Sequence, residues 1–227
     1  MRGTSFLLFV AFLVVSLAGV SGAATPWLAL EGSASTYAMD DVNNDLAAQN
    51  ALIGPGQPNF KMIENGVQFG AGGGFDFTRG VSVGIAVERL MAKSKLSDRF
   101  GSITYDMPAD LVRLFAEYRP GAARKAGLLL GASVGRLMQN GSVSLAFPGF
   151  DSSIKVEGDG IAGEAYGGGR LNVSPRFALL GTLGYRLANA KHVTAERQDV
   201  HNADGSDYTI DFSGVFVRLG LRISNPE

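Results

Sequence analysis

The segment GVQFGAGGGFDF, residues 66–77, has bulky side chains on one face and almost none on the other. Val67, Phe69, Phe75 and Phe77 alternate as the apolar residues of a β-strand do, and Gly70, Gly72 and Gly74 fill positions between them. Glycine weakens a strand, because it costs backbone entropy and offers no side chain for packing. The segment predicts a strand whose sparse face lies where space is short.

Period-2 segments of this kind recur along the chain and predict an all-β fold. The eight expected strands are Trp27–Thr36, Val67–Phe77, Val81–Leu90, Ile103–Tyr118, Gly127–Met138, Gly160–Val173, Phe177–Ala188 and Tyr208–Ile223.

The connections between these strands alternate strictly between short and long. Short turns are expected around residues 78–80, 119–121 and 174–176. The long connections are expected near residues 37–66, 91–102, 139–159 and 189–207. An even number of strands with tight turns at one end and long loops at the other is typical of a bacterial outer-membrane barrel.

The chain therefore resembles the small eight-stranded outer-membrane β-barrel proteins, the group with OmpA-, OmpX- and OmpW-like barrels. The resemblance lies in the strand and loop pattern of residues 25–227. It implies an eight-stranded antiparallel up-and-down transmembrane β-barrel, with tight periplasmic turns and external loops.

The first 24 residues have the pattern of a secretory signal peptide. Arg2 gives a cationic start, an apolar run follows from Phe6 to about Leu17, and small residues around Ala23 suit a cleavage site. We expect residues 1–24 to be removed and residues 25–227 to form the barrel domain in the outer membrane.

The distribution of small residues predicts which face points inward. Between residues 81 and 88 the odd positions read Val, Val, Ile and Val, whereas the even positions read Ser, Gly, Ala and Glu. The interior of an eight-stranded barrel is only just wide enough for side chains, so the small and polar face is expected inside and the bulky apolar face outside, against lipid. The alternative is a soluble periplasmic ligand-binding barrel with its apolar face inward.

The predicted inner face carries a balanced set of charges. The carboxylates are Glu31, Asp76, Glu88, Glu117 and Glu164, and the cations are Arg113, Arg170, Arg186, Arg218 and Arg222. An unpaired charge in a narrow interior is costly, and arginine suits bidentate contacts with carboxylates, so we expect ion pairs that fill the lumen. Asp76, Arg170 and Arg222 lie near strand ends, where water can reach them.

Residues 39–53 depart from the strand pattern. Met39, Val42, Leu46 and Ile53 recur at near-helical spacing, and acidic residues stand at the expected helix start. We expect a short amphipathic helix in the first external loop. It either packs as a cap on the barrel rim or lines a site for a small hydrophobic molecule.

Other classes of site receive little support from the sequence. A net charge of −1 and the absence of cysteine give no case for nucleic acid or a Cys-based zinc site, and no cofactor is expected. The last long connection contains His192, His201, Asp204, Ser206 and Asp207, yet no GxSxG or HExxH motif that would anchor a hydrolase. We expect a non-enzymatic protein without a metal site.

Three functions remain open. The first is a structural or interaction role, or slow passage of small solutes, for a monomer in contact with membrane lipid and lipopolysaccharide. The second is carriage of small hydrophobic molecules in the manner of OmpW-like proteins. The third is the soluble ligand-binding barrel.

Overall fold

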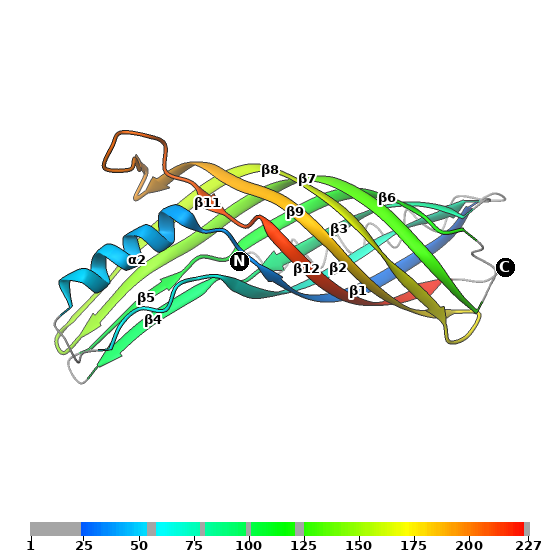
Figure 1. Ribbon diagram of the computed structural model, residues 1–227, viewed down its shortest axis with the longest axis horizontal. Helices are drawn as coiled ribbons and strands as arrows, with labels where there is room; N and C mark the ends of the chain where they lie inside the picture. Colours follow the sequence, from blue (N-terminus) through cyan, green and yellow to red (C-terminus); the bar gives the residue numbers. More distant parts are fainter. Residues whose placement is uncertain (1–23, 54–57, 78–79, 99–100, 121–124, 225–227) are drawn as a thin grey trace.

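The computed structural model describes residues 24–53, 58–77, 80–98, 101–120 and 125–224. Its main element is a closed antiparallel ring in the order β1-β2-β3-β6-β7-β8-β9-β12, in which β12 pairs again with β1 (Figure 1). The strands are β1 (Ala24–Thr36), β2 (Asn65–Phe77), β3 (Val81–Leu90), β6 (Ala109–Tyr118), β7 (Ala126–Phe147), β8 (Phe150–Asn172), β9 (Phe177–Ala195) and β12 (Gly214–Ser224). The predicted eight-stranded antiparallel up-and-down barrel is confirmed.

The expected long loops are largely β-structure. β7 and β8 pair continuously from Ala126↔Leu171 to Phe147↔Phe150, so the connection expected at 139–159 is a projecting hairpin. β9 likewise continues to Ala195, and the short strands β10 (Gln198–Asp199) and β11 (Ile210–Asp211) pair with it. We call the end with these extensions the long-loop end and the opposite end the short-turn end.

The strand expected at Ile103–Tyr118 is in fact two strands. β5 (Gly101–Asp106) ends before Met107-Pro108, and β6 begins at Ala109. Pro108 has no N–H to donate to a ladder, which favours the break at this point. β5 pairs with β7 and with β4 (Lys93–Asp98), so most of the loop expected at 91–102 is a hairpin. The expected strand Tyr208–Ile223 is also divided, into β11 and β12.

The predicted helix in the first long connection is present as α2 (Asp40–Leu52). It lies at the long-loop end beside β11, opposite the β4–β5 hairpin (Figure 1). Asn43 and Asn50 bind the returning chain at Ile63 and Phe60 through paired hydrogen bonds of 2.7–3.2 Å. In the described residues, no helix is both long and apolar enough to cross a membrane.

A belt of exposed apolar side chains surrounds the half of the barrel nearer the short-turn end. On β9 it extends from Phe177 to Leu187, and Leu183 in its middle is 58% exposed. Ten residue steps correspond to about 33 Å along a strand, or about 25 Å along the axis of a barrel whose strands tilt by about 40°. That height matches the apolar band of outer-membrane barrels. Phe77, Tyr118 and Phe177 are exposed aromatic residues near its short-turn edge.

Candidate functional site

The barrel interior is divided into four levels along its axis. From the short-turn end they are a lower ion-pair layer, an aromatic layer, a middle ion-pair layer and an upper apolar section. Each level collects inward-pointing residues from several strands at similar distances from the short-turn end.

The middle ion-pair layer comprises Glu31, Glu88, Glu164, Arg113, Arg186 and Arg218. Arg186 contacts Glu164 at 2.7 Å and Glu88 at 2.9 Å. Arg113 contacts Glu31 and Glu88, each at 2.7 Å, and Arg218 contacts Glu88 at 2.8 Å and Glu164 at 3.1 Å. Three carboxylates therefore balance three guanidinium groups.

Aromatic rings support the guanidinium groups of this layer. The Arg218 guanidinium carbon lies 4.5 Å from the centre of the Phe216 ring, and that of Arg113 lies 5.1 Å from the centre of the Phe115 ring. Each ring covers a guanidinium group and keeps water from it, and the negative face of the ring attracts the cation. Together with the ion pairs, they fill the cross-section at this level.

The aromatic layer lies below and consists of Trp27 and Phe115, which pack with Ala29 and Ala86. The Trp27 and Phe115 rings are 5.6 Å apart, and the indole Nε1 of Trp27 donates to Ser82 at 3.1 Å. Glycine is required beside them: a Cβ on Gly84 would lie 2.7 Å from Phe115 Cζ and 3.1 Å from Trp27 Cζ2.

The glycines of β2 have the same explanation. A Cβ on Gly70 would lie 2.7 Å from Glu88 Cγ, and one on Gly74 would clash with the Val83 carbonyl oxygen and lie 2.9 Å from Trp27 Cζ2. The sparse face of residues 66–77 thus leaves space for the neighbouring backbone and, at Gly70 and Gly74, for the large side chains of Glu88 and Trp27.

The lower ion-pair layer comprises Asp76, Glu117, Arg119, Arg170 and Arg222. Arg222 contacts Glu117 at 2.7 Å and Asp76 at 3.4 Å, and its guanidinium carbon lies 3.8 Å from the centre of a Trp27 ring. Arg222 is buried, although its place near a strand end indicated contact with water.

Arg119 was missed by sequence reasoning because it falls in the expected turn. It is buried, and its Nη2 forms an ion pair with Asp76. The signal was present: continuing the alternation of Arg113, Phe115 and Glu117 by one step places Arg119 inside.

The upper apolar section fills the barrel toward the long-loop end. Met39, Val42 and Leu46 are buried in it, and Ile53 is partly buried against it. Phe60 packs edge-on against Tyr105, with ring centres 5.5 Å apart. α2 is therefore part of a packed core.

Two carboxylates of α2 anchor it to the segment that precedes β11. The Tyr208 hydroxyl donates to Asp45 at 2.7 Å, and Thr209 donates to Asp41 through its backbone N–H at 2.7 Å and its hydroxyl at 2.9 Å. Burial raises the pKa of Tyr208 well above its usual value, and the bond to Asp45 raises this pKa further.

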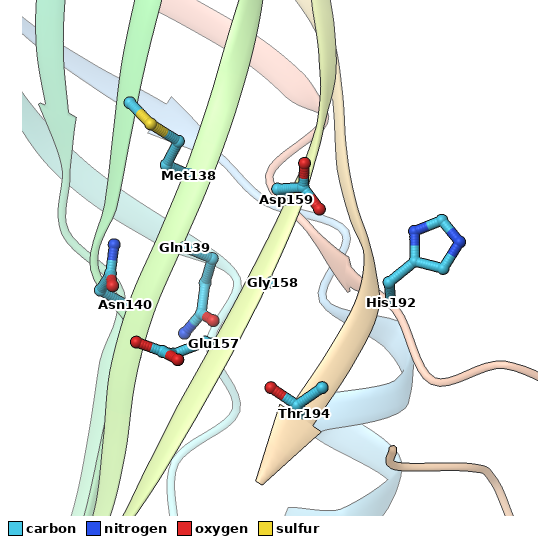
Figure 2. Close-up of a pocket in the computed structure, with 8 residues that line it drawn as sticks. All are labelled: Met138, Gln139, Asn140, Glu157, Gly158, Asp159, His192 and Thr194. Carbon is cyan, nitrogen blue, oxygen red and sulfur yellow. The ribbon is translucent and has the colours of Figure 1, made fainter. Parts of the chain in front are cut away.

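An open pocket of about 370 Å³ lies where β8 and β9 change register (Figure 2). β7, β8 and β9 supply its lining, including Asn140, Glu157, Asp159 and His192. His192 has a φ of 50° at this irregularity. Asp159 is already paired with Arg136 at 3.0 Å and Glu157 with Lys155, so their charges are compensated.

The polar residues considered for hydrolysis do not form a relay in the described structure. The Ser206 hydroxyl donates to Asp204 at 2.6 Å and accepts from Asn202 at 3.0 Å, whereas His201 faces Asp207 at 3.6 Å. His192 belongs to β9 and lines the open pocket between β7, β8 and β9. Within the described segments, no three His, Cys, Asp or Glu side chains gather as a metal site would require.

Comparisons with known proteins agree with the fold. The sequence matches no protein-family model and no curated protein. The attachment invasion locus protein Ail of Yersinia pestis, solved with the heparin analogue sucrose octasulfate, is similar in structure, with a TM-score of 0.51 and 13% identity over 90% of this chain and 100% of Ail.

Two further solved barrels are similar at lower scores. Neisserial surface protein A gives a TM-score of 0.48 at 13% identity, over 89% of this chain and 99% of that protein. OprG of Pseudomonas aeruginosa gives 0.46 at 15% identity, over 91% of this chain and 99% of that protein. The likeness to Ail confirms the expected fold of a small outer-membrane barrel.

Proposed function

We propose that this chain is an integral outer-membrane barrel with a structural or interaction role, and that it passes small solutes slowly at most. The observation that carries the proposal is the polarity of the barrel wall. Bulky apolar side chains such as Leu183 point outward, and charged side chains such as Glu164 and Arg186 are buried inside. Only a hydrocarbon surrounding makes this arrangement favourable.

The same polarity argues against the soluble ligand-binding barrel. A water-soluble barrel would need its apolar residues in the lumen, where the middle layer instead holds Glu88, Arg113 and Arg218. The belt of exposed apolar side chains is about 25 Å high, which is the height of the apolar band on barrels that span the outer membrane with strands. In the proposal residues 1–24 direct export, and residues 25–227 insert as a monomer.

The outer edge of the belt suits contact with lipid headgroups and lipopolysaccharide. Arg89 and Asp110 pair at 2.9 Å on the outer face, and Arg136 and Asp159 pair at 3.0 Å on neighbouring strands. These exposed pairs mark the level at which the wall changes from apolar to polar. We assign no reaction to the protein, because the polar residues considered for hydrolysis make hydrogen bonds and ion pairs with other neighbours in the described structure: Ser206 with Asp204 and Asn202, and His201 with Asp207.

Two measurements test insertion. Cell envelopes washed with sodium carbonate should retain the protein, and unheated samples should migrate differently from boiled ones on a gel, as folded barrels do. Extraction into the wash would show that the chain is not integral. In planar bilayers, large stable openings would contradict an interior filled by ion pairs.

Carriage of small hydrophobic molecules is a second candidate, favoured by one observation. The upper section is apolar and includes Met39, Val42 and Leu46 of α2, so displacement of α2 would expose an apolar chamber. A fluorescent naphthylamine probe would then bind the wild type but not Leu46→Asp. Leu52→Asp is the matched control, because Leu52 lies on the same helix and is 87% exposed. Absence of saturable binding to the wild type would exclude carriage of molecules of this kind.

A further inference from the structure

The lower ion-pair layer carries more positive than negative charge. Among the described residues it contains three guanidinium groups and two carboxylates, whereas the middle layer contains three of each. A net buried cation costs several kcal/mol unless another charge compensates it. The excess therefore calls for an anion.

The carboxylates of the middle layer are poorly placed to supply it. Trp27 and Phe115 lie between the two layers on one side of the lumen. On the other side Glu31 lines the same small pocket as Glu117, but its carboxylate is paired with Arg113 at 2.7 Å, and Glu88 and Glu164 are paired with Arg186 and Arg218. Glu117 is engaged with Arg222 at 2.7 Å. Of the two carboxylates in this layer, Asp76 is then the one left to pair with Arg119 and Arg170.

Asp76 alone cannot satisfy them. Its carboxylate pairs with Arg119, but it lies 3.4 Å from Arg222 and 3.8 Å from Arg170, beyond the 2.7–2.9 Å of a strong charge-assisted hydrogen bond. Arg119 is 2% exposed, and within the described part of the chain its Nε and Nη1 have no hydrogen-bond partner. The Nε of the buried Arg222 also has none there.

Buried nitrogens of Arg186 and Arg218 in the middle layer also lack a hydrogen-bond partner in the described residues, but there the charges are balanced. Only in the lower layer do unpartnered donors coincide with an excess of positive charge, and such donors need an acceptor.

The layer is accessible from the short-turn end. The side chains of Asp76 and Arg170 are 18% and 16% exposed. The exposed residues Lys125 and Arg176 lie at the same end, because their carbonyls accept hydrogen bonds from Asn172 at 2.7 Å and Ser224 at 2.9 Å. Positive side chains around an opening raise the local concentration of anions.

We propose that the lower ion-pair layer is a binding site for a small soluble oxyanion that enters from the short-turn end. Its principal donors are the Nε and Nη1 of Arg119, which Asp76 does not engage, and the terminal nitrogens of Arg170, whose Nε donates to Asn172 at 2.7 Å. The anion compensates the guanidinium charge that Asp76, 3.8 Å from Arg170 and 3.4 Å from Arg222, reaches only weakly. The site is a property of the folded barrel and goes beyond the proposed structural role.

Calorimetric titration with inorganic phosphate tests the site. The protein is folded in an uncharged detergent at fixed ionic strength, and the mobility shift of the unheated gel sample first verifies that each variant is folded. Wild type should bind phosphate saturably. Arg119→Gln should weaken binding at least tenfold, and Asp76→Asn, which removes the competing carboxylate, should strengthen it by a similar factor. Arg136→Gln removes a cation from the outer face and should leave the affinity unchanged.

The opposite signs of the two variants keep the test decisive. A purely structural role for these residues would not make Asp76→Asn bind more tightly. The proposal is overturned if wild type shows no saturation, or if Arg119→Gln and Asp76→Asn bind as wild type does. Saturation seen only with vesicles that contain phosphatidylglycerol would assign the site to a lipid headgroup and also overturn it. Failure of membrane insertion would leave these detergent results unaffected, so the two proposals fail separately.

Discussion

Glu164→Gln should be among the most destabilising single changes in the barrel. Glu164 accepts from Arg186 at 2.7 Å, from Arg218 at 3.1 Å and from the Ser133 hydroxyl at 3.1 Å, and it lies 3.6 Å from Arg113. Its neutralisation leaves three buried arginines with two carboxylates. Loss of one partner of a buried ion pair costs about 3–5 kcal/mol, and we expect a loss of this size in the free energy of unfolding.

Urea unfolding in phospholipid vesicles measures this loss. Trp27 is the single tryptophan and is buried in the aromatic layer, so its fluorescence reports on the interior. Asp159→Asn is the matched control: it breaks an exposed Arg136 pair on the outer face of the same strand and should cost less than about 1 kcal/mol.

A double variant separates charge balance from packing. Arg218→Gln alone should also cost about 3–5 kcal/mol, but combined with Glu164→Gln it restores two carboxylates to two arginines. The combined loss should be smaller than the sum of the single losses by about 1–3 kcal/mol. Strict additivity, or a Glu164→Gln variant within about 1 kcal/mol of wild type, would refute a closed and mutually compensated network.

Three further outcomes test other parts of the structure. Gly84→Ala should lower the free energy of unfolding by about 1–3 kcal/mol through overpacking against the aromatic layer; Gly181→Ala, whose Cβ meets only Leu219 at 3.7 Å, should be close to neutral in the same titration. Leu183→Arg should cost about 2–4 kcal/mol in vesicles, and a neutral result would contradict lipid contact. Hydrogen bonds from Ser206 lower the pKa of Asp204. These bonds therefore stabilise the turn at pH values above the ordinary carboxyl pKa, and the stabilisation is lost as the pH falls through the lowered pKa. Carboxyl NMR titration of Ser206→Ala should show that pKa moving back up, and an unchanged value would contradict this.

The wall of the barrel could be predicted from sequence because confinement leaves a clear pattern. Lipid demands apolar side chains at every second position, as at Val217, Leu219 and Leu221, and the narrow lumen favours a paired charge or a glycine between them, as at Arg218 and Gly220. α2 was also predictable, since Val42 and Leu46 bury one helical face.

The long-loop end was harder to predict because its strands face water. The register Ser144↔Ser153 pairs two hydroxyl side chains, and nothing in hydropathy distinguishes such a ladder from a polar loop. The ion-pair partners of each interior arginine could not be predicted from the sequence either. Arg218 reaches Glu31, Glu88 and Glu164 on three different strands, and only the closed ring determines which of them lies within contact distance.

The β7–β8 hairpin links the outermost point of the molecule to its charged centre. Its register is unbroken from the short-turn end to the exposed Phe147 and Phe150 at the tip, about 30 Å above the apolar belt by strand rise and tilt. The same two strands carry Ser133 and Glu164. A tensile load applied at the tip would therefore be transmitted through one continuous ladder to the middle layer, so that the resistance of the hairpin to pulling depends on the ion pairs in the lumen.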